Sequence, residues 1–137
     1  MGILLVGHGQ PDEWDVEWPT ETEQEIRFRE EVLKLFIEDG YKQKNLSLAW
    51  MEFKQPKPAV KVEEFVANGV EKVMFFSAAI SADAIHSQYD VPELVKKAKV
   101  PNNISLINLG AWNDDLLVIE AIKERVVEQM NFQKRSR

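Results

Sequence analysis

Short apolar runs alternate with longer amphipathic stretches along the chain. Four runs have the length and composition of buried strands, and they are residues 3–6, 46–51, 73–76 and 104–109. The first run stops at Gly7, the third at Ser77 and the fourth at Gly110. Continuous apolar runs of this length are typical of strands that are covered on both faces. The pattern therefore predicts a parallel sheet.

Between these runs, apolar positions recur every three or four residues, which is the spacing of a helix with one buried side. Helices are predicted over residues 20–40, 58–69 and 92–98. Thr20 and Glu23 have the spacing of a capping box at the start of the first helix. A last helix follows the fourth strand, and its apolar positions are Ile119, Ile122, Val126 and Met130. Strands that alternate with helices predict an α/β fold with helices on both faces of the sheet.

The chain has 137 residues, 45% of them hydrophobic and 29% charged, which fits one globular domain over residues 1–137. Residues 11–25 contain seven carboxylates and no Lys or Arg, and they are expected to form an acidic loop that includes Trp14 and Trp18. This loop is either simply solvated or a mobile lid whose indoles stack on a flat ligand. Residues 131–137 are expected to be a solvated basic tail.

Charge and cysteine content exclude several classes of function. The absence of cysteine excludes disulfides, thiolate-held zinc, iron–sulfur clusters and a cysteine nucleophile. A net charge of -6 disfavours binding to nucleic acid or to an anionic membrane. The apolar run at residues 3–6 is too short for a signal sequence or a membrane span. We therefore expect a cytoplasmic protein.

The candidate chemistry gathers at one edge of the predicted sheet. Ligands of open α/β sheets bind beyond the carboxyl ends of the strands. The chain's two histidines, His8 and His86, follow the first and third strands, and Glu52 follows the second. Two imidazoles and a carboxylate are ligands that Co²⁺, Ni²⁺, Fe²⁺ and Zn²⁺ accept. A site with so few protein ligands keeps open positions and is suited to handing the metal to another molecule.

The Gly-His-Gly sequence at residues 7–9 does not predict a phosphate site. Asp12 stands where a dinucleotide fingerprint has its third glycine, and more carboxylates follow it. A histidine phosphatase is excluded as well, because no arginine precedes His8 to hold a phosphate.

Each candidate residue also has a plain structural interpretation. His8 could serve only a turn, and His86 could be an ordinary surface histidine. Glu52 could cap a helix or pair with Lys54 or Lys57.

Three motifs together resemble the class II tetrapyrrole chelatases, in particular the small archaeal sirohydrochlorin cobaltochelatases. They are Gly-His-Gly after the first strand, Met-Glu-Phe at residues 51–53, and His-Ser-Gln-Tyr-Asp-Val-Pro at residues 86–92. The resemblance extends in the same order from residue 4 to about residue 122. It implies a flavodoxin-like, chelatase-type three-layer α/β sandwich with a four-stranded parallel sheet.

The resemblance also implies roles for particular residues. It makes His8 and His86 the metal-binding and catalytic pair and gives Glu52 an acid–base or metal role. Four more residues, which follow or end strands at the same edge of the predicted sheet, are candidate substrate contacts: Gly9, Gln10, Ser77 and Asp83. The expected substrates are a divalent metal (Co²⁺, Ni²⁺ or Fe²⁺) and a tetrapyrrole such as sirohydrochlorin, with no permanently bound cofactor. Short members of this family pair as homodimers, so a homodimer is expected.

Other functions fit the same residues. A non-catalytic metal or tetrapyrrole carrier would use the same edge of the sheet, and a scaffold module would leave the histidines incidental. A specialised, ferrochelatase-like relative is a further alternative. The physiological metal, the tetrapyrrole and the pathway stay open at this point.

Overall fold

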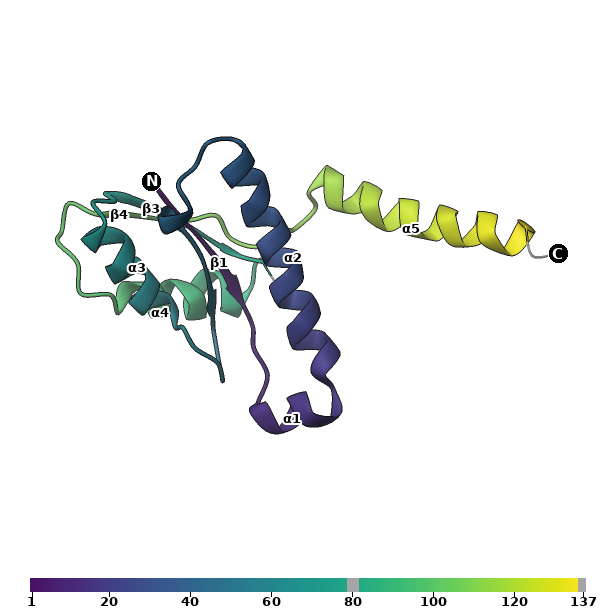
Figure 1. Cartoon of the computed structure of the whole chain (residues 1–137), viewed down its shortest axis with the longest axis horizontal. Helices are drawn as coiled ribbons and strands as arrows, with labels where there is room; N and C mark the ends of the chain where they lie inside the picture. Colours follow the sequence, from purple (N-terminus) through teal and green to yellow (C-terminus); the bar gives the residue numbers. More distant parts are fainter. Residues whose placement is uncertain (79–81, 136–137) are drawn as a thin grey trace.

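All four predicted strands pair in one parallel sheet with the order β2-β1-β3-β4. The computed structural model describes residues 1–78 and 82–135 (Figure 1). The strands are β1 (Gly2–Gly7), β2 (Leu46–Trp50), β3 (Lys72–Ser77) and β4 (Ser105–Asn108). The order places β1 and β3 in the middle of the sheet, so the residues after these two strands share the centre of its carboxyl edge.

Helices lie on both sides of the sheet. The helical segments are α1 (Asp12–Glu17), α2 (Pro19–Glu38), η1 (Gln43–Asn45), α3 (Pro58–Ala67), η2 (His86–Asp90), α4 (Val91–Lys96) and α5 (Leu116–Arg135). The elements η1 and η2 are a 3₁₀ turn and a π-helical turn. Figure 1 shows α3 and α4 together on one side of the sheet and α2 on the other.

The alternation of side chains along β1 builds two apolar layers. Leu4 and Val6 join the core beneath α3 and α4. Ile3 and Leu5 face α2 and pack with its apolar residues. The expected three-layer α/β sandwich is confirmed.

Arg29 of α2 is a buried cation that ties this helix to two strands. Its Nη1 donates hydrogen bonds to the carbonyl oxygens of Ala49 (2.8 Å) and Leu5 (3.3 Å). The guanidinium lies 4.2 Å from the centroid of the Trp50 ring, a cation–π arrangement. A Cβ at Gly7 would come within 2.6 Å of the guanidinium carbon, so Arg29 requires glycine there. The end of β1, just before His8, is therefore set by this packing.

The expectation of an acidic loop over residues 11–25 is wrong. These residues form α1 and the first turns of α2. The capping box of Thr20 and Glu23 is also wrong, because α2 begins one residue earlier, at Pro19. Proline suits the first position of a helix, where the missing N–H would have no partner within the helix.

Two further boundaries differ from expectation. The segment before residue 92, for which the apolar pattern predicts neither a strand nor a helix, contains η2, which runs directly into α4. The basic tail begins later than expected, because α5 continues through Arg135. Residues 79–81, which follow the third predicted strand, and residues 136–137 of the predicted tail lie outside the described residues.

The last helix forms as predicted, but its apolar side is exposed. Figure 1 shows α5 projecting away from the sheet. Ile119, Ile122, Val126 and Met130 keep between 49% and 63% of their surface exposed. Within residues 1–78 and 82–135, no helix combines the length and the apolar character needed to cross a lipid bilayer.

Candidate functional site

The structure brings the two histidines together. His8 follows β1, and His86 is the first residue of η2, which comes after β3. Because β1 and β3 are paired neighbours in the sheet, their carboxyl ends meet. The ring centroids of His8 and His86 are 5.5 Å apart, with the ring planes at 83° to each other. Residues 78 positions apart in the chain thus form one pair of imidazoles.

Each ring has one nitrogen held by the protein. Nδ1 of His8 lies 2.8 Å from the carbonyl oxygen of Gly9. Nδ1 of His86 lies 2.7 Å from Oδ2 of Asp90. A carbonyl or a carboxylate can only accept, so Nδ1 is the donor in each neutral ring. Nε2 then carries the lone pair in both rings, and this is the nitrogen that can bind a metal or take a proton.

The loop that carries His8 is fixed by its neighbour after β2. The backbone N–H of Glu52 donates to the carbonyl oxygen of His8 at 2.9 Å, and the N–H of Met51 donates to that of Gly7 at 2.8 Å. Gly9 has φ +89, and a Cβ there would lie 2.0 Å from the carbonyl oxygen of Glu52. Glycine is therefore required at position 9 for both conformation and space.

Glu52 is near the histidines through its backbone, and its side chain is exposed. The Glu52 carboxylate acts on Lys57, whose pKa is lowered by burial and raised by this carboxylate. Across the described ranges 1–78 and 82–135, no three or more His, Cys, Asp or Glu side chains gather as a metal cage. The acid–base role of Glu52 stays a prediction, and the metal-capable group in the structure is the pair of histidines.

Asp83 holds the segment before His86 against the linker between β4 and α5. Its Oδ1 accepts hydrogen bonds from the backbone N–H of Ala111 at 2.8 Å and from the Ser87 hydroxyl and the Gln88 amide, each at 2.9 Å. The Asn113 side chain also donates to this carboxylate. The donors, Asn113 first and then Ala111 and Ser87, lower the pKa of Asp83. In this structure Asp83 positions the turn that carries His86, and its predicted contact with the substrate stays a prediction.

Hydrogen bonds to one carboxylate, Asp15, hold the acidic residues 11–25 in place. The side chains of Gln10, Lys54 and Thr22 donate hydrogen bonds to Asp15 and lower its pKa to about 2. Gln10 is buried, and its amide also donates to the carbonyl oxygen of Trp18 at 2.9 Å. Of the remaining predicted substrate contacts, Ser77 is fully buried beneath the edge, and Gly9 lies in the His8 loop. Substrate contacts by Gln10, Ser77 and Gly9 stay predictions.

Sequence reasoning missed two carboxylates beside the histidines. Asp90 was visible only as part of a motif, and its spacing of four residues from His86 gives a contact because η2 is helical. Glu25 of α2 is half-buried and acts electrostatically on His8 and Arg29. Burial raises the pKa of Glu25, while Arg29 and His8 lower it and Glu21 raises it. No sequence motif identifies Glu25, because its proximity to His8 depends on how α2 packs against the sheet.

Exposed apolar side chains flank both histidines, and these were also missed. Phe53 follows Glu52, has a positive φ of 65° and leaves 56% of its surface exposed. Ile85 and Tyr89 flank His86 in the chain and are 63% and 61% exposed. A non-glycine residue with positive φ is uncommon and is worth attention near a candidate site.

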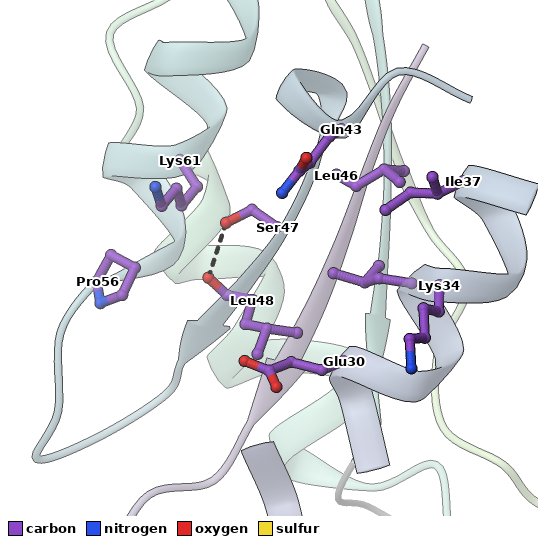
Figure 2. Close-up of a pocket in the computed structure, with 10 residues that line it drawn as sticks. Glu30, Lys34, Ile37, Gln43, Leu46, Ser47, Leu48, Pro56 and Lys61 are labelled. Atoms are coloured by element: carbon purple, nitrogen blue, oxygen red, sulfur yellow. Dashed lines mark hydrogen bonds between the residues drawn. The ribbon is translucent and has the colours of Figure 1, made fainter. Parts of the chain in front are cut away.

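Two surface pockets are lined by neither of the two histidines. Figure 2 shows one between α2, the first residues of β2 and α3, with a volume of about 470 Å³. None of the predicted site residues lines it, and Leu46, Ser47 and Leu48 place it at the amino-terminal half of β2. A second pocket, of about 580 Å³, is lined by Gln10, Trp14 and Trp18 together with Glu13, Glu17 and Glu21. The two indoles are thus on one pocket wall, and stacking on a flat ligand stays a prediction.

Comparisons with known proteins agree with this fold. The model of the CbiX family matches residues 2–129. A crystal structure of a protein from Marinobacter aquaeolei VT8, described as a cobalamin (vitamin B12) biosynthesis CbiX protein, superposes with a TM-score of 0.62. The two sequences are 21% identical over 95% of this chain and 97% of that chain, a likeness that shows the fold alone. No curated protein matches the chain.

Replacing Asp83 with Asn should loosen the linker between β4 and α5. Ala111 donates to Oδ1 of Asp83 and Asn113 donates to Oδ2, whereas an asparagine accepts at one oxygen only, so one of the two contacts must be lost and the linker is held less firmly. We expect amide hydrogen exchange at Ala111 to become at least about 10-fold faster, as measured by NMR. Asp114→Asn, in the same linker, is the matched control and should leave that rate unchanged. Equal exchange rates at Ala111 in Asp83→Asn and in the native chain would contradict the positioning role.

Proposed function

Since the chain belongs to the CbiX family of class II chelatase-like proteins, we propose that it inserts a divalent metal ion into a tetrapyrrole such as sirohydrochlorin. Co²⁺ is the metal we expect, with Ni²⁺ and Fe²⁺ as alternatives. Both the metal ion and the macrocycle are substrates in this proposal, and no resident cofactor is required. The pair of imidazoles formed by His8 and His86 is the single observation that carries it.

Insertion exchanges two protons for one metal ion. The free macrocycle loses the protons of two pyrrole N–H groups, the metal ion forms bonds to the ring nitrogens, and two protons pass to the protein and then to water. The Nε2 lone pairs of His8 and His86 can do both tasks required of the protein, which are to hold the metal ion and to accept a proton. Two protein ligands leave most of the metal's coordination positions free for the macrocycle.

Asp90 distinguishes the two rings. A carboxylate that accepts from Nδ1 fixes the tautomer and orientation of His86 and balances the positive charge that the ring gains on protonation. His8 has a neutral carbonyl oxygen in the same position. We assign first binding of the metal ion to both rings, its delivery to His8, and proton removal to His86 once its Nε2 has released the metal ion, with Asp90 as a positioning residue.

The exposed apolar side chains beside the histidines supply a surface for the macrocycle. Phe53 lies beside the His8 loop, and Ile85 and Tyr89 lie beside His86. Covering such side chains with a flat conjugated ring removes apolar surface from water, which favours binding. The macrocycle is then held with its nitrogens toward the two imidazoles.

The reaction is tested by an absorbance time course with sirohydrochlorin and Co²⁺, repeated with Ni²⁺ and Fe²⁺ and with no protein as the baseline. We expect the native chain to accelerate insertion and His8→Ala and His86→Ala each to lower the rate by about 100-fold or more. Lys97→Ala, an exposed residue just after α4, is the control and should keep most of the activity. Binding of metal or macrocycle without acceleration would instead indicate a carrier. Absence of both binding and acceleration would favour a scaffold with incidental histidines.

A separate variant tests the role of Asp90. Asp90→Ala should lower kcat by about 10- to 100-fold, because the His86 ring loses its fixed orientation, and should leave KM for the macrocycle nearly unchanged. Asp90→Glu should restore part of kcat, and Glu93→Ala, a nearby exposed carboxylate on α4, should have no effect. A fall in activity that appears only in KM would contradict the positioning role.

A further inference from the structure

The pocket beside the two indoles has the chemistry of a separate binding site. It lies where α1 meets the first turn of α2 (Figure 1), and we call it the indole pocket. Its volume is about 580 Å³, and its walls consist of two indoles, three carboxylates and one amide, from Trp14, Trp18, Glu13, Glu17, Glu21 and Gln10. Trp14 and Trp18 leave 59% and 69% of their surface exposed. Tryptophan is highly buried on average in folded proteins, so two exposed indoles in one pocket indicate a surface that a ligand covers.

The charge of the indole pocket is uncompensated. Among the residues that the structure describes, none pairs its side chain with a glutamate of this pocket in an ion pair or a hydrogen bond. Lys54, a cation bound to α1, contacts Asp12 and Asp15 instead. Glu13 and Glu17 are four residues apart in one helix, which places both carboxylates on the same side of α1. The pocket therefore attracts cations and repels anions.

Gln10 adds a buried acceptor to the same wall. It keeps only 4% of its surface exposed, and its Nε2 donates to Asp15 at 2.6 Å and to the carbonyl oxygen of Trp18 at 2.9 Å. Both partners can only accept, and this fixes which end of the amide is the nitrogen. Within the described part of the chain, no group donates to Oε1 of Gln10. A ligand with an N–H group would supply the missing donor.

The walls of the indole pocket are held in place without a ligand. Asp15 accepts hydrogen bonds from Thr22 at 2.7 Å and from Gln10, and Lys54 ties the same carboxylate to the loop after β2. The backbone N–H of Trp18 donates to the carbonyl oxygen of Trp14 at 2.7 Å. A site that is already ordered loses less conformational entropy when it binds.

From these observations we propose that the indole pocket binds an aliphatic polyamine, a chain of methylene groups that carries two or more protonated amines. The ammonium groups donate hydrogen bonds to the carboxylates and to Oε1 of Gln10. The methylene groups lie on the indole faces, and the adjacent positive charges are attracted by the same rings. This inference does not rest on metal insertion, and its test measures binding rather than activity.

A metal ion matches the pocket less well. Across residues 1–78 and 82–135, no three or more His, Cys, Asp or Glu side chains are close enough to hold one. A hydrated metal ion would be attracted by the charge alone and would leave the indoles uncovered. An anionic ligand would be repelled by three carboxylates. A polyamine uses the charge, the indoles and the amide oxygen together.

The test is isothermal titration calorimetry of the full chain with spermidine at fixed ionic strength. We expect one spermidine to bind per chain. Trp14→Ala and Glu17→Gln should each raise the dissociation constant by about 5-fold or more, because one removes an indole face and the other a charge. Val16→Ala and Glu23→Gln are matched controls, since both residues are exposed and neither lines the pocket. The controls should leave the dissociation constant within about 2-fold of the native value.

Because Trp14 and Glu17 are exposed, both variants should fold, and their thermal unfolding checks this. Absence of binding at millimolar spermidine would overturn the proposal. Native-like binding by Trp14→Ala would also overturn it, because the site would then be an acidic surface without a role for the indole. Displacement of spermidine by an equal concentration of Mg²⁺ would indicate a metal-ion site instead. Tighter binding of trilysine than of spermidine would indicate a basic peptide as the ligand, and either result would overturn the polyamine assignment.

Discussion

The carboxylate of Asp83 is the contact on which the site and the outer shape both depend. It accepts hydrogen bonds from the turn that carries His86 and from the linker that leads to α5. The same contact requires glycine at position 110, because a Cβ there would come within 2.7 Å of Asp83 Oδ1. One side chain thus places a histidine of the proposed active site and holds the linker from which α5 begins. Any change that weakens this contact should disturb both.

The site itself follows from the order of the strands. Parallel strands bring their carboxyl ends to one edge, and β1 and β3 are neighbours at the centre of the sheet. Two contacts then hold the loop after β1. The Arg29 guanidinium packs against Gly7, and the backbone N–H of Glu52 donates to the carbonyl oxygen of His8. His8 has little freedom as a result. A rigid pair of imidazoles at an open edge is suited to a metal ion that must arrive and leave within one turnover.

The strands and most helices could be predicted from the sequence because their apolar spacing reports burial directly. The histidine pair was also predictable, since both residues follow strands. The helix α1 was not, because most of its residues are acidic and Asp15 within it is held by polar side chains, Gln10 and Lys54, which leave no apolar pattern. The contact of Asp90 with His86 depended on the π-helical turn, and that of Glu25 depended on the register of α2. For α5, the periodicity predicted the helix correctly. The periodicity does not show, however, that the apolar side of this helix is left exposed.

The central claim of the proposal is that the two imidazoles bind one metal ion through Nε2 while both Nδ1 atoms are held by the protein. Because the chain contains only two histidines, long-range ¹H–¹⁵N NMR of the imidazoles resolves it directly, with Zn²⁺ as a diamagnetic probe. In the metal-free protein, Nδ1 of both rings should be the protonated nitrogen. Zn²⁺ should then shift both Nε2 signals together, with one saturation curve. A shift confined to one ring, or a shift of the Nδ1 signals, would contradict the account.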